Sequence, residues 1–169
     1  VISAQGITLN RTSVTVEAGY NYQLTATVTP ESTTNKGVIW SSSDETVAKV
    51  NTNGLVTVIA GGTCVITATT VSGGISAKCT FKVLQDPSGI EVDSHVRNMY
   101  VGQVATITAT VLPLTATSRD VTWTSSNTNI ATVTSKGIVT ALSRGTAIIT
   151  AKTKVGGYTA TCAVTVGDK

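Results

Sequence analysis

The feature that most constrains this chain is an internal repeat. Shifted by 83 residues, the sequence matches itself without a gap: residues 7–83 align with residues 90–166 and share 28 identities in 77 positions. The only two tryptophans, Trp40 and Trp123, fall on each other. A repeat of this length can close its own small hydrophobic core, whereas stacked solenoid repeats are usually about 20–50 residues long. The sequence therefore predicts two globular units in tandem.

Within each unit, apolar and polar residues alternate. Residues 23–29, 77–83 and 105–111 all follow this pattern, which is typical of a strand with one buried face. Threonine supplies 33 of the 169 residues, and this β-branched side chain suits strands while its hydroxyl faces water. No window follows a period of 3.6 residues, so we expect no helix beyond a single turn.

Turn residues lie where the strands should end. Pro30 and Pro113 each follow an alternating segment, and proline cannot donate to a strand ladder. Asn53-Gly54 predicts a tight hairpin turn, and the glycine pairs at 73–74 and 156–157 are expected to join the last two strands of each unit. The spacing predicts about seven short strands per unit, as in a two-sheet sandwich.

The resulting fold class is all-β, with two tandem immunoglobulin-like β-sandwiches. We place the first at residues 1–84 and the second at residues 90–169, with a short linker at residues 85–89. Pro87 stiffens this linker, so we expect restricted hinging between the units.

A spaced set of motifs occurs in both units. The first copy has 40–44 (WSSSD), 47–50 (VAKV), 54–56 (GLV), 62–63 (GT) and 66–68 (ITA). The second copy has 123–127 (WTSSN), 130–133 (IATV), 137–139 (GIV), 145–146 (GT) and 149–151 (ITA). This set resembles the signature of the bacterial immunoglobulin-like group 2 domain, over nearly the whole chain.

The resemblance implies a β-sandwich of the kind found in bacterial surface proteins, adhesins, cell-wall enzymes and phage virion proteins. In such proteins it serves as a stalk, spacer or adhesion module. It brings no catalytic residues that could be transferred to this chain.

Residues of the repeated motif also have expected structural roles. Each unit's tryptophan has inward parity and should fill the core between the two sheets. Asp44 and Asn127 can accept a hydrogen bond from the backbone two residues on. Gly54 and Gly137 are expected to supply a positive φ.

Three cysteines are the first candidates for chemistry. In a regular hairpin Cys79 would face residue 68, about 13 Å along the strand from Cys64, beyond the Cα separation of about 7 Å that a disulfide spans. We therefore predict that Cys64, Cys79 and Cys162 are buried free thiols. A bridge through an irregular hairpin, or a metal or catalytic thiol, is the alternative.

Other reactive groups do not form a catalytic set. His95 is the only histidine, no zinc-like spacing occurs, and Ser41–Ser43 lack a general base that could activate them. We predict that the chain is not an enzyme and needs no cofactor. Asp86, Glu91 and Asp93 lie near the domain junction, where they either form a solvated linker or contribute to a calcium site.

Tyrosines are the remaining ligand-capable groups. Tyr22 has inward parity and is expected in the core. Tyr100 and Tyr158 are expected to be exposed, and an exposed tyrosine can stack on a sugar or anchor a protein contact. They are the candidate ligand-binding residues, with the ligand itself open.

Charge and hydropathy exclude two classes of partner. The formal net charge of +3 comes without any run of Lys or Arg, so we expect no nucleic-acid partner. No stretch approaches the roughly 20 apolar residues of a membrane span, so we expect no membrane insertion. The chain starts at Val1 without a signal peptide, which we interpret as a processed protein or an excised fragment.

The leading hypothesis is a non-enzymatic, extracellular stalk or adhesion module of a bacterial surface protein. Its partner would be a protein or glycan on a cell surface, or a neighbouring surface subunit. One alternative is a phage virion decoration, fibre or tail-appendage protein, and another is an accessory domain of a carbohydrate-active enzyme.

Overall fold

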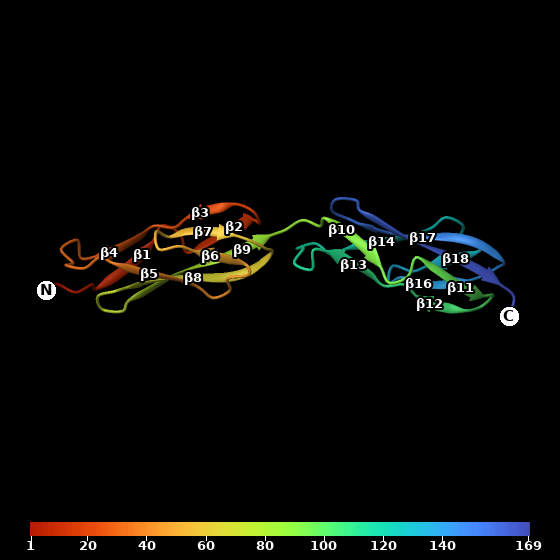
Figure 1. Ribbon diagram of the computed structural model, residues 1–169, viewed down its shortest axis with the longest axis horizontal. Helices are drawn as coiled ribbons and strands as arrows, with labels where there is room; N and C mark the ends of the chain where they lie inside the picture. Colours follow the sequence, from red (N-terminus) through yellow and green to blue (C-terminus); the bar gives the residue numbers. More distant parts are fainter. The chain divides into compact units, whose positions relative to one another are not determined.

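The computed structural model describes residues 1–169, which divide into two compact units, Val1–Gln85 and Asp86–Lys169. Each unit contains nine strands and no helix, so the all-β prediction is confirmed (Figure 1). The chain accordingly contains no helix with the length and apolar character needed to cross a membrane.

In unit one the strands are β1 (Gly6–Leu9), β2 (Ser13–Glu17), β3 (Asn21–Gln23), β4 (Ala26–Thr29), β5 (Val38–Ser42), β6 (Ala48–Val50), β7 (Leu55–Val58), β8 (Gly62–Thr70) and β9 (Ser76–Leu84). In unit two they are β10 (Gly89–Val92), β11 (Val96–Tyr100), β12 (Val104–Thr106), β13 (Ala109–Leu112), β14 (Val121–Ser125), β15 (Ala131–Val133), β16 (Ile138–Ala141), β17 (Gly145–Thr153) and β18 (Thr159–Gly167). Gly89, placed in the linker by the sequence prediction, is thus the first residue of β10.

Each unit is a sandwich of two layers. In unit one, a four-stranded sheet has the order β2-β9-β8-β5, and the other layer consists of β3-β7-β6 and the pair β1-β4. Strand β2 runs parallel to β9, while the other pairs are antiparallel. Unit two repeats this plan with β11-β18-β17-β14, β12-β16-β15 and β10-β13.

The unit has nine strands rather than about seven because two of the expected strands are interrupted. The segment at 23–29 changes partners between β3 and β4. The Asn10 side chain holds this break: its Oδ1 accepts the Thr25 N–H at 2.9 Å and its Nδ2 donates to the Gln23 carbonyl at 3.3 Å. In unit two Asp93 occupies the same position and accepts the Thr108 N–H at 3.1 Å. Counted as single interrupted strands, β1/β2 and β3/β4 return the expected seven.

The inward residues of the alternating segments form the core of each unit. Leu24, Ile66 and Phe81 are fully buried in unit one, and burying each such side chain contributes about 1.5–3 kcal/mol. Tyr22 is half-buried and packs edge-on against Phe81, with ring centroids 5.8 Å apart, as its parity predicted. All threonines except Thr33, Thr70 and Thr153 are exposed or half-buried.

The predicted turns are confirmed in both units. Strand β4 ends immediately before Pro30 and β13 before Pro113. Asn51 closes the β6–β7 turn, because its Oδ1 accepts the N–H groups of Asn53 and Leu55 at 2.9 and 3.0 Å. Gly54 has the expected positive φ of 79°.

The expected register of the β8–β9 hairpin is wrong by two residues. Cys79 faces Ile66 rather than residue 68. The turn is centred before the glycine pair because the buried Thr70 bonds across it: its hydroxyl accepts the Ile75 N–H at 3.0 Å, and its own N–H donates to the Ile75 carbonyl at 2.8 Å. Cys64 therefore lies diagonally across from Cys79, two residues closer than expected.

Candidate functional site

Each unit has a groove beside its tryptophan. In unit one the groove, of about 430 Å³, lies where β3 passes into β4, next to β5 and the β6–β7 turn. Its apolar floor consists of Leu24, Ala26, Val38 and Trp40. Its rim consists of Gln23, Thr25, Lys36, Thr52 and Asn53. We call this the Trp40 groove.

Unit two has a corresponding groove of about 200 Å³, the Trp123 groove. Its floor consists of Ile107, Ala109, Val121 and Trp123. Its rim consists of Thr106, Thr108, Ser135 and Lys136. Shifted by 83 positions, these eight residues fall on eight of the nine that line the first groove, so the two copies share the groove as well as the fold.

The sequence predicted that the indole fills the core between the two sheets, but the structure places it at the edge of the core. Trp40 packs against buried residues of both halves of the unit-one core, yet its side chain is only partly buried. The reason is that β5 is the outermost strand of its sheet, so no further strand covers that side of the ring. The Gly54 backbone lies against the covered side, where a Cβ would stand 2.8 Å from Cζ2 of the ring.

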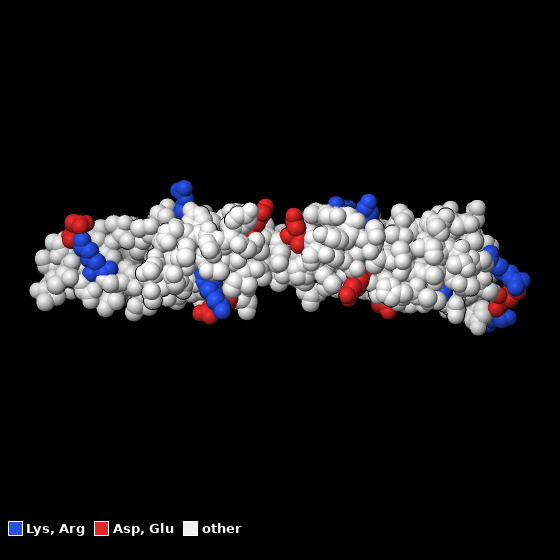
Figure 2. All heavy atoms as spheres, turned by 45° about the horizontal axis from the view of Figure 1, so that its top comes forward, with Lys and Arg blue, Asp and Glu red and all other residues white.

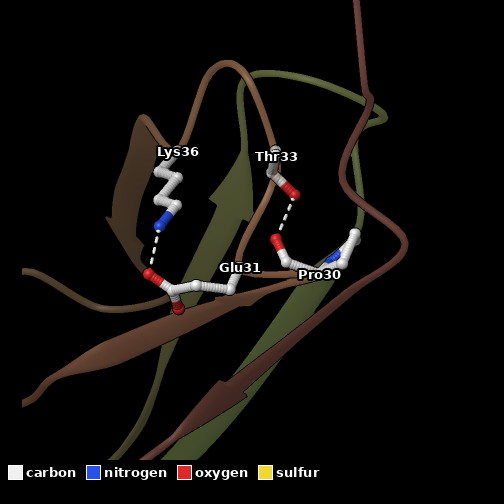
Figure 3. A network of polar contacts seen from close by, with 4 residues as sticks. All are labelled: Pro30, Glu31, Thr33 and Lys36. Carbon is white, nitrogen blue, oxygen red and sulfur yellow. Dashed lines mark hydrogen bonds and ion pairs between the residues drawn. The ribbon is translucent and has the colours of Figure 1, made fainter.

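One ammonium group borders each groove, from a different loop in each unit. Lys36 comes from the β4–β5 connection, and its Nζ pairs with Glu31 Oε1 at 2.7 Å (Figure 3). The hydrogen bond and the charge of Lys36 lower the pKa of the Glu31 carboxyl below its usual value. In the same loop the Thr33 hydroxyl donates to the Pro30 carbonyl at 2.6 Å. Lys136, from the β15–β16 turn, forms no ion pair.

Neither groove is lined by an aspartate or a glutamate. Charged groups are sparse elsewhere too, and Figure 2 shows them scattered among uncharged side chains. The Gln23 amide joins two edges of the Trp40 groove, because its Nε2 donates to the carbonyls of Leu24 at 2.7 Å and Asn53 at 2.8 Å. The groove therefore combines an aromatic floor, neutral hydrogen-bonding groups and one cation.

The two candidate tyrosines are not brought together. Tyr100 is 52% exposed at the end of β11, and Tyr158 is 41% exposed just before β18. Tyr100 lies beside Gly167, the last residue of β18, so the two tyrosines are about 30 Å apart along that strand. They do not form a single site, and the structure leaves their role as ligand contacts a prediction.

The three thiols are buried and free, as predicted. Burial raises the pKa of Cys64, Cys79 and Cys162 above the usual thiol value. Such thiols remain protonated at neutral pH, and they lack the thiolate character of a nucleophile or a metal ligand.

No group of three or more His, Cys, Asp or Glu side chains is placed to hold a metal ion. His95 is exposed, and its Nδ1 lies 3.2 Å from the Thr161 carbonyl. Of the carboxylates considered for calcium, Asp93 has a structural role that the sequence analysis missed, since it supports the strand break described above.

The sequence analysis also missed the two grooves, although the sequence of each unit contains a signal for one. The glycine of the tight turn lies against the tryptophan ring in each unit. What the sequence does not reveal is that the tryptophan strand lies at the edge of its sheet. That position depends on long-range pairing.

Comparison with known proteins gives relatives in several settings. The chain is 38% identical over 92% of its length to an uncharacterized protein of Clostridium acetobutylicum, of which it covers 16%. It is 35% identical over 98% of its length to an Ig-like virion protein of Serratia phage KSP90, of which it covers 66%. An alpha-L-arabinofuranosidase of Bifidobacterium longum is 36% identical over 80% of the chain, which covers 13% of that enzyme. The chain thus spans less than two thirds of the length of each of these relatives.

A solved structure of Drosophila N-cadherin EC1-4 shares the fold. Its TM-score is 0.51 at 12% identity, with 98% of this chain and 50% of the cadherin chain covered. The family model of the bacterial Ig-like domain (group 2) matches residues 3–81 and again residues 88–164. Because the model matches nearly all of each sandwich, the chain belongs to the bacterial Ig-like domain (group 2) family.

Proposed function

We propose that the chain is a non-catalytic, extracellular stalk or adhesion module of a bacterial surface protein. The observation that carries this proposal is the parallel pairing of the second strand with the last strand of each unit, β2 with β9 and β11 with β18. In unit one β2 and β9 are parallel neighbours, with Ser13 opposite Thr80 and Glu17 opposite Leu84. The Ala18 N–H extends the pair by donating to the Leu84 carbonyl at 2.8 Å.

This pairing suits a module that is pulled by its ends. The chain enters β2 from one side and leaves β9 at the other, so tension slides the two parallel strands past each other. The hydrogen bonds of the pair are then loaded together instead of opening one after another. Unit two repeats the arrangement, with Val96–Tyr100 of β11 along Ala163–Gly167 of β18.

The partner of such a module would be a protein or a glycan on a cell surface, or a neighbouring subunit of the same surface. Contacts would use loop tips and strand faces, which rigid scaffolds commonly present for binding. The match to the bacterial Ig-like domain family and the Ig-like virion relative support a non-catalytic role.

Antibodies raised against the chain test this proposal on the organism or particle that produces it. We expect them to label intact cells, with no increase after lysis. Labelling that appears only after lysis would contradict an extracellular role. Hydrolysis of glycoside or peptide substrates by the purified chain, surviving repeated purification, would contradict the non-catalytic role.

A second candidate is a virion protein of a phage. It is favoured by the phage relative, which matches 98% of this chain. Of the relatives described above, this is the one of which the chain covers the largest share, 66%. In that role the sandwiches would decorate a capsid, fibre or tail appendage. Co-purification with intact virions through a density gradient would support it, and recovery only in the soluble fraction would count against it.

A third candidate is an accessory domain of a carbohydrate-active enzyme. It is favoured by relatives named alpha-L-arabinofuranosidase, kappa-carrageenase and lacto-N-biosidase, of which this chain covers 13%, 17% and 8%. A glycan array tests this role. Binding that Tyr100→Ala or Tyr158→Ala abolishes would implicate the exposed tyrosines, and silence on the array would argue against this candidate.

A further inference from the structure

We propose that the Trp40 and Trp123 grooves are twin binding sites for acidic polysaccharide, each taking a short segment of a sugar chain that carries carboxylate or sulfate groups. This ligand class goes beyond the stalk function, which would stand if the grooves bound nothing.

Recurrence of the grooves is the first support. The two units are identical at fewer than half of their aligned positions, since 28 of 77 match, yet eight lining positions coincide. The floor keeps its apolar character with Leu24 replaced by Ile107 and Val38 by Val121. A simple packing defect at a sheet edge has no reason to retain both an aromatic floor and a polar rim.

The chemistry of the lining identifies the ligand class. A partly exposed indole offers an apolar face to the C–H groups of a sugar ring, as aromatic side chains do in polar interfaces. The rim supplies hydroxyls and amides for sugar hydroxyls, such as those of Thr25, Asn53 and Ser135. Each groove adds one lysine and no carboxylate, which favours an anionic over a neutral sugar. One cation per groove, without a basic stripe, is too little for nucleic acid.

The two grooves differ in the availability of their cation. Lys36 is engaged by Glu31, whose side chain is 93% exposed, whereas Lys136 has no acidic partner. The Trp123 groove should therefore bind an acidic sugar more tightly. Releasing Lys36 with Glu31→Gln should strengthen binding to the Trp40 groove by about threefold, the scale of one exposed ion pair.

Tryptophan fluorescence tests the proposal directly, because the chain has only two tryptophans and each lies in one groove. The probes are polygalacturonate for carboxylates, dextran sulfate for sulfates, and dextran and oligo-dT as the neutral and nucleic-acid comparisons. We expect one or both acidic polysaccharides to change the emission of both tryptophans, with little effect of dextran or oligo-dT. Trp40→Phe and Trp123→Phe assign the signal to each groove, after thermal unfolding has shown that each variant folds.

Charge variants separate the grooves from general attraction. Lys136→Ala should weaken binding at the Trp123 groove by about threefold. The Trp40 groove should not be affected by this change, because the two sites lie in separate units. Lys36→Ala should in turn weaken only the Trp40 groove, and by less, because Lys36 is already paired with Glu31. Lys78→Ala, an exposed lysine outside both grooves, is the matched control. The proposal is overturned by an unchanged emission with both acidic probes, by equal binding of dextran or oligo-dT, or by a Lys78→Ala effect as large as that of Lys136→Ala.

Discussion

Gly54 shows how a single missing side chain holds the tryptophan in place. Its φ of 79° is in the left-handed region, and an added Cβ would stand 2.5 Å from the Leu24 carbonyl oxygen and 2.8 Å from the Trp40 ring. The Leu24 backbone cannot move away easily, because its N–H donates to the Gly54 carbonyl at 3.0 Å and the Asn10 side chain bonds the residues on either side of it. The turn and the groove floor are therefore built around this glycine.

Substituting Gly54→Ala should destabilise unit one by about 2–4 kcal/mol, from left-handed strain together with overpacking. Gly74→Ala is the matched control, since Gly74 has a φ of 65° but nothing within 4 Å of an added Cβ. It should cost only the strain of about 1–2 kcal/mol. Urea unfolding of the two variants measures the difference, and equal losses would refute the contribution of the clash.

The Asp44 carboxylate stabilises the turn that follows β5 by accepting two hydrogen bonds from Thr46. Hydrogen bonds from the Thr46 hydroxyl and the Thr46 N–H lower the pKa of its carboxyl. Because the folded pKa lies below the unfolded one, the stabilisation is present at neutral pH. It is lost as the pH falls below about 4, through the folded pKa. Asn127 accepts the equivalent N–H from Asn129 at 3.0 Å without a charge.

Asp44→Asn should therefore reduce the acid sensitivity of unit one, while Asn127→Asp should introduce it into unit two. The measurement is the urea midpoint of each unit between pH 2 and 7. Glu31, whose pKa is also lowered, leaves a smaller pH dependence in the Asp44→Asn variant. Identical pH profiles for the variants and the parent chain would show that this turn is not linked to protonation.

At the scale of the strands, the parallel pair β2–β9 is the element that tension would load in shear. Ala18→Pro removes the N–H that bonds the Leu84 carbonyl, since proline has no amide hydrogen. We expect a clear fall in the force needed to unfold unit one, with unit two as an internal reference in the same molecule. Single-molecule stretching of the chain measures both units.

The matched control for this variant is Val71→Pro. It also removes one backbone bond, from the Val71 N–H to the Gly37 carbonyl at 2.9 Å, but away from the parallel pair. Its effect on unfolding force should be small. If the two substitutions lower the force equally, the parallel pair is not the mechanical clamp.

The sequence predicted the strands and turns because these depend on local pattern. Alternation located both faces of the long strands, and the turn glycines located the hairpins. The sequence could not locate the break at Leu24–Thr25, because apolar and polar residues continue to alternate across this break without a change of parity. The register of β8 and β9 was missed because it depends on the side chain of Thr70, which bonds across the turn. The grooves depend on which strand is outermost, a property of the whole sheet.

At the scale of the whole molecule, the two units have separate cores. The buried cluster of unit two contains only residues from Ile90 onward, and both clusters of unit one lie between Ala4 and Val83. Since each cluster is complete within its unit, neither half needs the other to bury its apolar surface. The tandem repeat in the sequence was sufficient to predict this division.

Fragments 1–85 and 86–169 should therefore each fold when expressed alone. We expect dispersed amide spectra by NMR and cooperative unfolding for both fragments, as is usual for single domains of this size. The intact chain should unfold in two transitions wherever the stabilities of the units differ. A fragment that folds only after its other half is added would show that the units are interdependent.

The scarcity of charge on these sandwiches has a consequence for the solutions they tolerate. Three of the four ion pairs join exposed groups, and the fourth joins the half-buried Arg97 to the exposed Asp93 at 3.9 Å. Each such pair contributes at most about 1 kcal/mol, which added salt screens. Apolar burial and backbone pairing, aided by uncharged hydroxyls at the surface, account for most of the stability. The melting temperature should therefore hardly change between dilute buffer and the ionic strength of seawater, which would suit the extracellular role proposed above.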